Sequence, residues 1–309
     1  MYPGEWTSSR PSALMDDMTR PTLSVVVPTY NESAVIEACL DALLAQSDDI
    51  HEIVVVDNNS QDDTVEKVEA RAAEHADATG RDPVVVLHET RQGLPFARDT
   101  GLNAATGDVL ARIDADARVE PGWARATLDF FHRYGDVYAA GSGTCTAYDL
   151  PFQDKFRAAQ DALGRTVRQK LADGMDVDAP RLFGSNMALT REAWCRVRSV
   201  TSTRTDIFED VDLTICATEN GIRCAIIPDA RALISGRRFK SGLVSYLRYS
   251  WCDQRTFAMH DRKAERRRAV VTMLTVTIPF YLVMWAPFRM WDTRTESFDP
   301  MRLFRAPHD

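Results

Sequence analysis

Short runs rich in Val and Ile alternate with helical patterns along the first third of the chain, and this alternation restricts the fold more than any other feature. The apolar runs predict strands at 23–28, 53–57, 83–87 and 108–113. The segments between them predict helices at 33–46, 60–76 and 93–105. Strands that alternate with helices form βαβ units, so we expect an α/β fold with a mainly parallel central sheet.

Polar side chains follow three of these strands at the point where each one ends. They are Thr29 to Glu32, Asp57 to Ser60, and Asp114 with Asp116. Ligands of parallel sheets bind beyond the carboxyl ends of the strands, so the three clusters should share one rim. Residues two apart in a strand point the same way, so Asp114 and Asp116 can converge on one divalent cation. An ordinary polar turn after a strand is the alternative.

The second half of the chain is less regular. Its patterns predict a helix at 151–175, a loop at 183–185 that enters a strand, a helix at 212–220 and a strand at 223–228. The six cysteines form no Cys-x-x-Cys pair, which favours reduced thiols in a cytosolic domain. His260 belongs to no cluster with metal-ligand spacing, and we expect it on the surface; a distant third ligand of the cation is the alternative.

The charge of the chain is unevenly distributed. The formal net charge of −8 argues against nucleic-acid binding. The segment 236–268 nevertheless carries ten basic residues against three acidic ones. Such a segment suits the phosphate headgroups of a membrane surface.

An uncharged run follows directly at 269–288. A helix of this length is about 30 Å long, which matches the hydrocarbon core of a bilayer. A spanning helix, a re-entrant or interfacial helix and a buried core helix all remain open, and Pro279 should kink any of them. Arg266, Arg267 and Arg268 would keep the start of this helix on the cytoplasmic side.

Five short motifs in matching order resemble family-2 inverting glycosyltransferases with the GT-A fold, over roughly 23–233. The motifs are Val27-Pro-Thr-Tyr-Asn-Glu32, Val56-Asp-Asn-Asn-Ser60, Gly93-Leu-Pro-Phe-Ala-Arg98, Asp114-Ala-Asp116 and Glu209-Asp210. Asp99 stands where the third motif often has asparagine. A dinucleotide fingerprint, Gly-x-Gly-x-x-Gly, is missing after the first strand.

The resemblance implies a role for each motif. The donor nucleotide would contact Pro28, Thr29, Tyr30, Glu32, Asp57, Asn59, Arg98 and Asp114. Asp57 would read the base, and Arg98 would approach the diphosphate. Asp114 and Asp116 would bind Mg²⁺ or Mn²⁺. Asp210 would be the catalytic base beside Glu209, although Glu209 can equally be an ion-pair partner of Arg204 or another base.

The resemblance also suggests an acceptor side, formed by Gly184, Ser185 and Asn186. Gln254 and Arg255 lie in a stretch that only partly resembles the Gln-x-x-Arg-Trp motif of processive members. The two residues are adjacent, and Phe257 stands in place of the tryptophan, so polymer synthesis is not implied.

We therefore expect a disordered lead-in at 1–21, a GT-A catalytic domain at 22–235 and a basic helical segment at 236–268. A membrane-spanning or interfacial helix at 269–288 and a tail at 289–309 should follow. The expected activity is metal-dependent transfer of a sugar, in the hexosyltransferase class, from a nucleotide-sugar donor to a glycan or lipid-linked acceptor at the inner face of the cell membrane. A sugar-phosphate nucleotidyltransferase and a non-catalytic nucleotide-sugar-binding scaffold are the alternatives.

Overall fold

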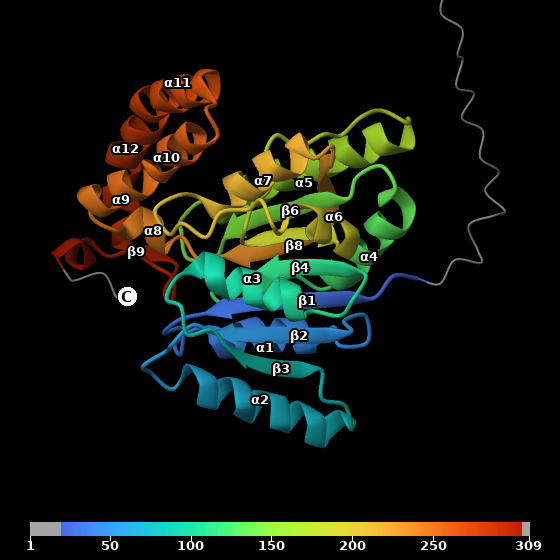
Figure 1. Cartoon of the computed structure of the whole chain (residues 1–309). Helices are drawn as coiled ribbons and strands as arrows, with labels where there is room; N and C mark the ends of the chain where they lie inside the picture. Colours follow the sequence, from blue (N-terminus) through green and yellow to red (C-terminus); the bar gives the residue numbers. More distant parts are fainter. Residues whose placement is uncertain (1–19, 305–309) are drawn as a thin grey trace, which may run out of the picture.

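One eight-stranded sheet organises the protein, whose computed structural model describes residues 20–304 (Figure 1). The strand order is β3-β2-β1-β4-β7-β6-β8-β5. The strands are β1 (Leu23–Thr29), β2 (Glu52–Asp57), β3 (Val84–His88), β4 (Val109–Ile113), β5 (Arg118–Val119), β6 (Ala140–Ala147), β7 (Asn186–Thr190) and β8 (Cys224–Ile234).

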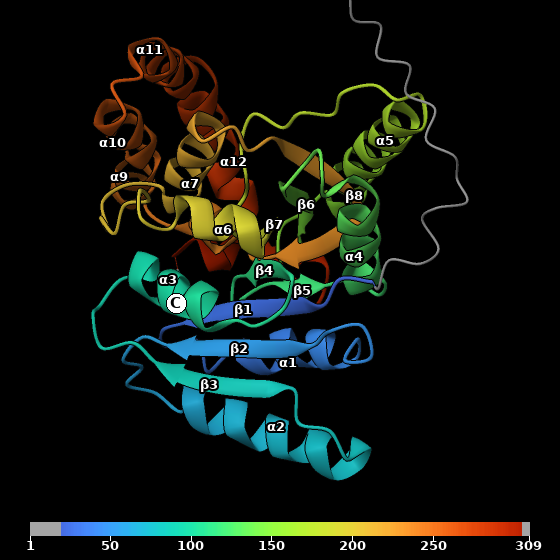
Figure 2. The same ribbon diagram turned by 45° about the vertical axis from the view of Figure 1, so that its right-hand side comes forward.

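Helices cover both faces of this sheet (Figure 2). One face carries α1 (Ile36–Leu44), α2 (Thr64–Thr79), α4 (Trp123–Tyr134) and α5 (Gln153–Ala172). The other face carries α3 (Leu94–Ala104), α6 (Arg191–Val197) and α7 (Glu209–Glu219). Alternate residues of one strand supply the two cores, since Val25 and Val27 pack in the first and Val26 in the second. A strand buried on both faces must be apolar throughout, which explains the continuous apolar runs.

The first half of the sheet is parallel, as the alternating pattern predicts. β1 pairs in parallel with β2 and β4, and β2 pairs in parallel with β3. Their carboxyl ends therefore lie at one edge, where Asp57 and Asp114 follow β2 and β4. The expectation of an α/β fold with a mainly parallel central sheet is confirmed.

β8 corrects the predicted strand at 223–228, because it continues past Pro228 to Ile234. An irregularity permits this: Ser142 pairs with Ile226, whereas Thr144, two residues on, pairs with Arg231. Asp229 in the bulged segment has a φ of 69°, and the Asn186 side chain donates to the carbonyl of Ala230 at 2.9 Å. A bulge of this kind accommodates a proline that a regular strand would reject.

The C-terminal segment forms helices beyond the edge to which β1, β2 and β3 point (Figure 1). They are α8 (Arg237–Lys240), α9 (Leu243–Ser250), α10 (Cys252–Met259), α11 (Lys263–Thr272), a π-helical turn (Met273–Thr277) and α12 (Ile278–Met290). The π-helical turn ends two residues before Pro279, whose ring would clash with the carbonyl four residues earlier in a regular α-helix. The predicted kink at Pro279 thus takes the form of a π-turn within one long helix.

The two ends of the chain were predicted as a lead-in and a tail. Residues 1–19 and 305–309 lie outside the described residues. The described part of the tail is structured: β9 (Trp291–Asp292) pairs with β10 (Ser297–Phe298), and a 3-10 helix follows at Pro300–Phe304.

Gly143 supplies a test of the β6–β8 irregularity. A Cβ at this position would overlap the carbonyl oxygen of Ala230 and the side-chain amide of Asn186. Gly143→Ala should therefore lower the free energy of unfolding by about 1–3 kcal/mol, the usual cost of overpacking, as measured by urea denaturation. Gly164→Ala on α5 is the control, since its Cβ would meet nothing closer than 3.9 Å and alanine favours helix. Equal stability of Gly143→Ala and wild type would contradict the close approach.

Candidate active site

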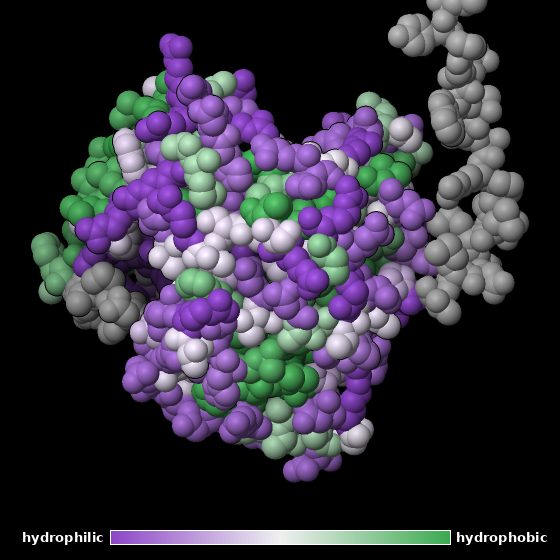
Figure 3. Space-filling model, viewed as in Figure 1, coloured by the Kyte–Doolittle hydropathy of each residue, from purple (hydrophilic) through white to green (hydrophobic). Residues whose placement is uncertain are grey.

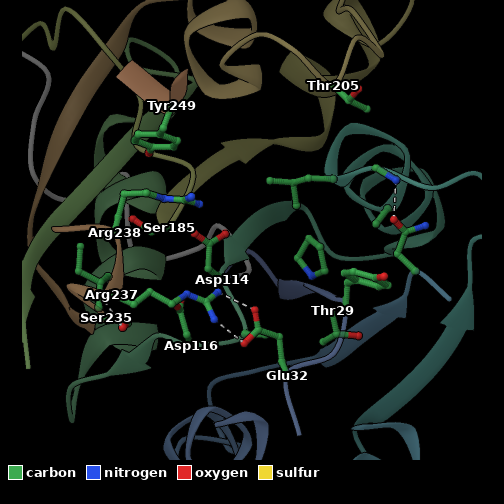
Figure 4. Close-up of a pocket in the computed structure, with 18 of the residues that line it drawn as sticks. Thr29, Glu32, Asp114, Asp116, Ser185, Thr205, Ser235, Arg237, Arg238 and Tyr249 are labelled. Atoms are coloured by element: carbon green, nitrogen blue, oxygen red, sulfur yellow. Dashed lines mark hydrogen bonds and ion pairs between the residues drawn. The ribbon is translucent and has the colours of Figure 1, made fainter. Parts of the chain in front are cut away.

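A cavity of about 610 Å³ opens at the edge of the sheet where β1, β2 and β4 end (Figure 4). Its walls combine the segment after β1, the loop after β4, the segment before β7 and the C-terminal helices. The lining side chains include Thr29, Tyr30 and Glu32, then Asp114 and Asp116, then Ser185, and finally Arg237, Arg238 and Tyr249. Segments that are distant in the sequence therefore meet at this rim.

One end of the cavity is acidic. Glu32 and Asp116 converge on the guanidinium of Arg237 (Figure 4). Arg237 donates to the two carboxylate oxygens of Glu32 at 3.0 and 2.6 Å, and its Nε lies 3.1 Å from Asp116 Oδ2. Asp114 lines the same end, with its side chain 35% exposed.

The electrostatics of this end suit a cation. Burial raises the pKa of Asp116 to about 6; Arg237 opposes the rise, while the carboxylates of Asp114 and Glu32 add to it. Negative charge is thus concentrated in a poorly solvated place. Carboxylate oxygens are the ligands that Mg²⁺ and Mn²⁺ prefer, so the donor set of Asp114 and Asp116 fits such an ion.

Arg112 connects the acidic end to α7. Its side chain is only 1% exposed, and its guanidinium donates to Asp114 Oδ1 at 2.7 Å and to Glu209 Oε1 at 2.5 Å. Burial alone would raise the pKa of Glu209, but the charge and hydrogen bond of Arg112 outweigh burial and lower it. Glu209 is therefore an ionised partner that fixes Arg112, and through it the orientation of Asp114.

Asp210 does not itself line the cavity, but it is bound by Gly184, which directly precedes the lining residue Ser185. It accepts hydrogen bonds from the backbone N–H of Gly184 at 3.2 Å and from Arg181 at 3.3 Å. Burial raises the pKa of Asp210, and the charge of Arg181 only partly offsets this effect. Its side chain remains 13% exposed, so the carboxylate keeps some access to solvent.

Comparison with known proteins decides the family. A model described as Glycosyl transferase family 2 matches residues 24–194, which is more than half of the chain. The chain belongs to glycosyltransferase family 2. The predicted family and the predicted enzyme class, a glycosyltransferase, are thus confirmed.

Curated relatives from this family match only part of the chain. Glycosyltransferase AglE of Haloferax volcanii is 33% identical over 107 residues, which are 34% of this chain and 34% of that protein. The putative glycosyltransferase EpsH of Bacillus subtilis is 34% identical over 111 residues, which are 36% of this chain and 30% of that protein. The chain matches about a third of the length of these relatives.

Solved structures resemble the chain over a longer span. The mannosyltransferase PcManGT of Pyrobaculum calidifontis, solved with GDP-Man and Mn²⁺, is 22% identical; the match covers 93% of this chain and 79% of that one, with a TM-score of 0.58. GalNAc-T7, solved with UDP, GalNAc and Mn²⁺, is 16% identical; the match covers 70% of this chain and 43% of that one, with a TM-score of 0.54. These similarities establish the predicted GT-A fold.

The family-2 motifs of the donor side divide into two groups. Pro28, Thr29, Tyr30, Glu32 and Asp114 all line the cavity. Asp57 and Asn59 lie beside it, and their neighbour Asn58 lines it instead. Asp57 is buried at the end of β2 and accepts from the N–H of Ser60 at 3.1 Å, and Asn59 donates to the carbonyl of Thr90 at 2.9 Å.

Arg98 is a correction to the motif-based prediction. It was expected to approach the donor diphosphate, but its side chain is fully buried on the face of α3 that meets α7. There it donates to Asp99 Oδ1 at 2.7 and 2.9 Å and to the carbonyl of Glu209 at 3.1 Å. Arg98 therefore supports the start of α7 and does not reach the cavity.

The predicted acceptor residues are also separated by the structure. Ser185 lines the cavity and Gly184 holds Asp210, but Asn186 is buried and bonds the backbone of β6 and β8. Gln254 is 2% exposed, and its amide pairs with the carbonyl of Arg266 and the N–H of Val270 on α11 at 3.1 Å. Arg255 contacts Asp206. Gln254 is thus buried away from any acceptor, whereas Arg255 does not line the cavity and its place on the acceptor side stays a prediction.

Several residues of the site carry no motif. Arg237, Arg238 and Tyr249 line the cavity, and the Arg238 guanidinium lies 4.4 Å from the centre of the Tyr249 ring. The many arginines of 236–268 could have indicated these residues, but from the sequence they predict only a membrane contact. Arg112 could not be recognised as a site residue from the sequence, because a charged residue inside an apolar strand is not expected to be buried.

His260 was expected on the surface, and the structure places it differently. Its side chain is 13% exposed, and Nε2 lies 2.8 Å from Oδ1 of the fully buried Asp212. Cys216 lies in the same group, and the three potential ligand atoms are within 4.8 Å of one another. None of these residues lines the cavity. The pair fastens α10 to α7.

Removal of Arg112 tests its structural role. Arg112→Met leaves Glu209 buried without its counter-charge, so the free energy of unfolding should fall by about 3–5 kcal/mol in urea denaturation. Adding Glu209→Gln should recover part of this loss, because the unpaired charge is then removed. Arg125→Met is the control: this arginine is 52% exposed and pairs with Asp49, so the expected loss is below about 1 kcal/mol. A loss of unfolding free energy as small as this in Arg112→Met would exclude Arg112 as a structural bridge between Asp114 and Glu209.

Proposed function

We propose that this family-2 enzyme transfers a hexose from a nucleoside-diphosphate donor with inversion of configuration, in a reaction that depends on a divalent cation and on Asp210 as base. One observation carries the proposal. Three carboxylates, Glu32, Asp114 and Asp116, lie at one end of the cavity, and a fourth, Asp210, is bound by Gly184, the chain neighbour of the cavity-lining Ser185. The three carboxylates that suit a cation and a leaving diphosphate are thus separate from Asp210, the carboxylate that suits proton transfer.

The acidic end suits the diphosphate side of a donor. Bound Mg²⁺ or Mn²⁺ would supply positive charge against the negative charge that develops on a leaving diphosphate. Asp114 and Asp116 are its proposed ligands, and Arg112 holds Asp114 in place. Pro28, Thr29 and Tyr30 form the adjoining wall, which would receive the nucleoside, with Asp57 and Asn59 beside it. The Mn²⁺ bound in PcManGT and GalNAc-T7, which share this fold, supports the choice of ion.

Asp210 suits the acceptor side. Inversion requires a base on the face of the sugar opposite the leaving group, where it accepts the proton of the attacking hydroxyl. Burial raises the pKa of Asp210, which makes its carboxylate a stronger proton acceptor. Gly184 and Arg181 fix the orientation of this carboxylate. With a lipid phosphate as acceptor, little proton abstraction is needed, and Asp210 would position the acceptor.

Two substitutions separate these roles. Asp210→Asn should reduce sugar transfer by about 10²–10⁴-fold, because the base is lost, and should leave nucleotide binding unchanged. Asp116→Ala should abolish transfer and also remove the Mn²⁺-dependent stabilisation by UDP, GDP or dTDP sugars in a thermal-shift screen. Asp206→Asn is the control, because this exposed carboxylate pairs with Arg204 and does not line the cavity. Unchanged transfer in either variant would remove that residue from the mechanism.

The C-terminal helix supports membrane association. Lys263–Met290 is continuous over 28 residues; its most apolar 18-residue window has a mean hydropathy of 1.8, and only 11% of that window is buried. This exposure argues against the interpretation as a buried core helix. Figure 3 shows hydrophobic side chains gathered along the outer edge of α11 and α12. The most exposed ones are Val271, Leu274, Val276, Leu282 and Val283.

The contacts of this helix favour an interfacial position over a spanning one. Near its start, Arg262 pairs with Glu219 at the end of α7. Beyond its end, Phe298 packs on Phe152 at the start of α5, with ring centroids 6.4 Å apart. Both ends are thus tied to the catalytic domain, on the same side of any bilayer. We propose that the apolar face of the helix lies in the cytoplasmic leaflet of the membrane, with Arg266, Arg267 and Arg268 among the headgroups.

Vesicle flotation tests this arrangement. The chain should float with anionic vesicles and be released by alkaline carbonate, which does not extract a spanning helix. Changing Arg266, Arg267 and Arg268 to Gln should weaken vesicle binding up to about a hundredfold, at about 1 kcal/mol per basic residue. A triple change of Lys155, Arg165 and Lys170 to Gln on exposed α5 is the matched control. Resistance to carbonate would support the spanning helix, and equal binding of both triple variants would exclude the headgroup contact.

A further inference from the structure

Arg237 occupies the acidic end of the cavity (Figure 4). Its fork contacts both oxygens of Glu32 at 2.6 and 3.0 Å, and its Nε contacts Asp116 at 3.1 Å. The side chains of Glu32 and Asp116 are only 15% and 14% exposed, so this one guanidinium supplies most of their counter-charge. A divalent cation bound by Asp116 would share this carboxylate group with Arg237.

We propose that Arg237 is an internal counter-ion, which neutralises Glu32 and Asp116 while the cavity lacks a cation and turns to the donor phosphates when cation and donor bind. This role rests on the proposed function, since the cation and the nucleoside diphosphate are its ligands. It makes Arg237 a substrate-binding residue that none of the sequence motifs contains.

The backbone on both sides of Arg237 is fixed. Gly236 donates its N–H to Asp149, and Phe239 packs on Phe288 with ring centroids 5.7 Å apart. The carbonyl of Ser241 accepts from the Tyr281 hydroxyl at 2.5 Å and from Trp285 Nε1 at 3.1 Å. α8 therefore stays in place, and any movement of the guanidinium must come from the side-chain torsions of Arg237.

The cavity leaves room for the side chain of Arg237 to adopt other rotamers. This side chain is 50% exposed and borders the open cavity, so other rotamers are accessible without displacing a packed group. Arginine prefers planar, paired oxygen acceptors, and a diphosphate offers the same pattern as a carboxylate. Arg238 lines the same mouth of the cavity, so a phosphate group there would face two adjacent arginines.

Electrostatics links the two positions. A divalent cation at Asp116 repels a guanidinium only a few ångströms away, and it also removes the need for a counter-ion. Binding of the cation without a donor must therefore displace Arg237 with no compensating contact. The affinity for the cation alone is lower for this reason. With a donor present, the displaced guanidinium gains the phosphates. Cation and nucleoside diphosphate should consequently bind with positive coupling, and Arg237 should carry much of that coupling.

Two titrations of the full chain test this role. Mn²⁺ alone is titrated by electron paramagnetic resonance, and UDP and GDP are each titrated calorimetrically with and without Mn²⁺. In Arg237→Ala, the affinity for Mn²⁺ alone should rise about tenfold, because the competing internal cation is gone. The gain in nucleoside diphosphate affinity that Mn²⁺ confers should shrink by a similar factor. Arg237→Gln should behave alike and serves if the alanine variant does not fold.

Arg248→Ala is the matched control. Arg248 is an exposed arginine of α9 in the same basic segment, outside the cavity, so its removal changes the net charge equally. Both titrations of this variant should match wild type. A rise in Mn²⁺ affinity as large as that of Arg237→Ala would reduce the effect to overall charge and overturn the proposal.

The remaining outcomes are also decisive. Mn²⁺ binding that is lost in Asp116→Ala but unchanged in Arg237→Ala would leave the proposed function standing and reject the internal counter-ion. Mn²⁺ binding that is detectable only in Arg237→Ala would support the counter-ion in its strongest form. The absence of Mn²⁺ binding in wild type and in Arg237→Ala alike would overturn the counter-ion together with the cation dependence of the proposed function.

Discussion

The buried guanidinium of Arg112 is the contact on which the geometry of the site depends. It bridges Asp114, at the end of β4, and Glu209, at the start of α7. A buried arginine with one partner would carry a large desolvation cost, and the second carboxylate offsets it. Gly184 belongs to the same arrangement, because a Cβ there would stand 2.6 Å from the Arg112 guanidinium. The segment that supports Asp210 can therefore approach Arg112 only with glycine at this position.

The pairing of a carboxylate with an arginine recurs around the cavity. Arg112 holds Asp114, Arg181 holds Asp210 and Arg237 holds Asp116. The surroundings of the three arginines differ, and so do their expected roles. Arg112 is fully enclosed, whereas Arg181 and Arg237 are 32% and 50% exposed. A carboxylate paired with an enclosed arginine keeps a fixed position, and one paired with an exposed arginine can exchange its partner for a ligand at low cost.

Much of the fold was accessible from the sequence, because β1, β2 and β4 are mostly apolar and end in polar clusters. The same logic brought Glu32, Asp114 and Asp116 to one rim. It failed for β6, whose sequence Ala-Gly-Ser-Gly-Thr-Cys-Thr-Ala carries no strand pattern, because small residues are needed beside the β8 bulge. The motifs misplaced Arg98 and Gln254, because a motif identifies a residue but not the direction in which its side chain points. Arg237 was missed because its partners, Glu32 and Asp116, lie far away in the sequence.

The C-terminal segment links the cavity to the apolar surface of the protein. α8 places Arg237 and Arg238 in the cavity, and its neighbouring backbone is bound to Tyr281 and Trp285 of α12. α12 in turn exposes Leu282 and Val283, which stand between these two contacts in the sequence, on the face proposed to meet lipid. One helix therefore supports the segment that carries the arginines and also carries the apolar face that we propose to lie on a membrane. The carbonyl of Ser241 is the point at which these two parts of the structure are joined.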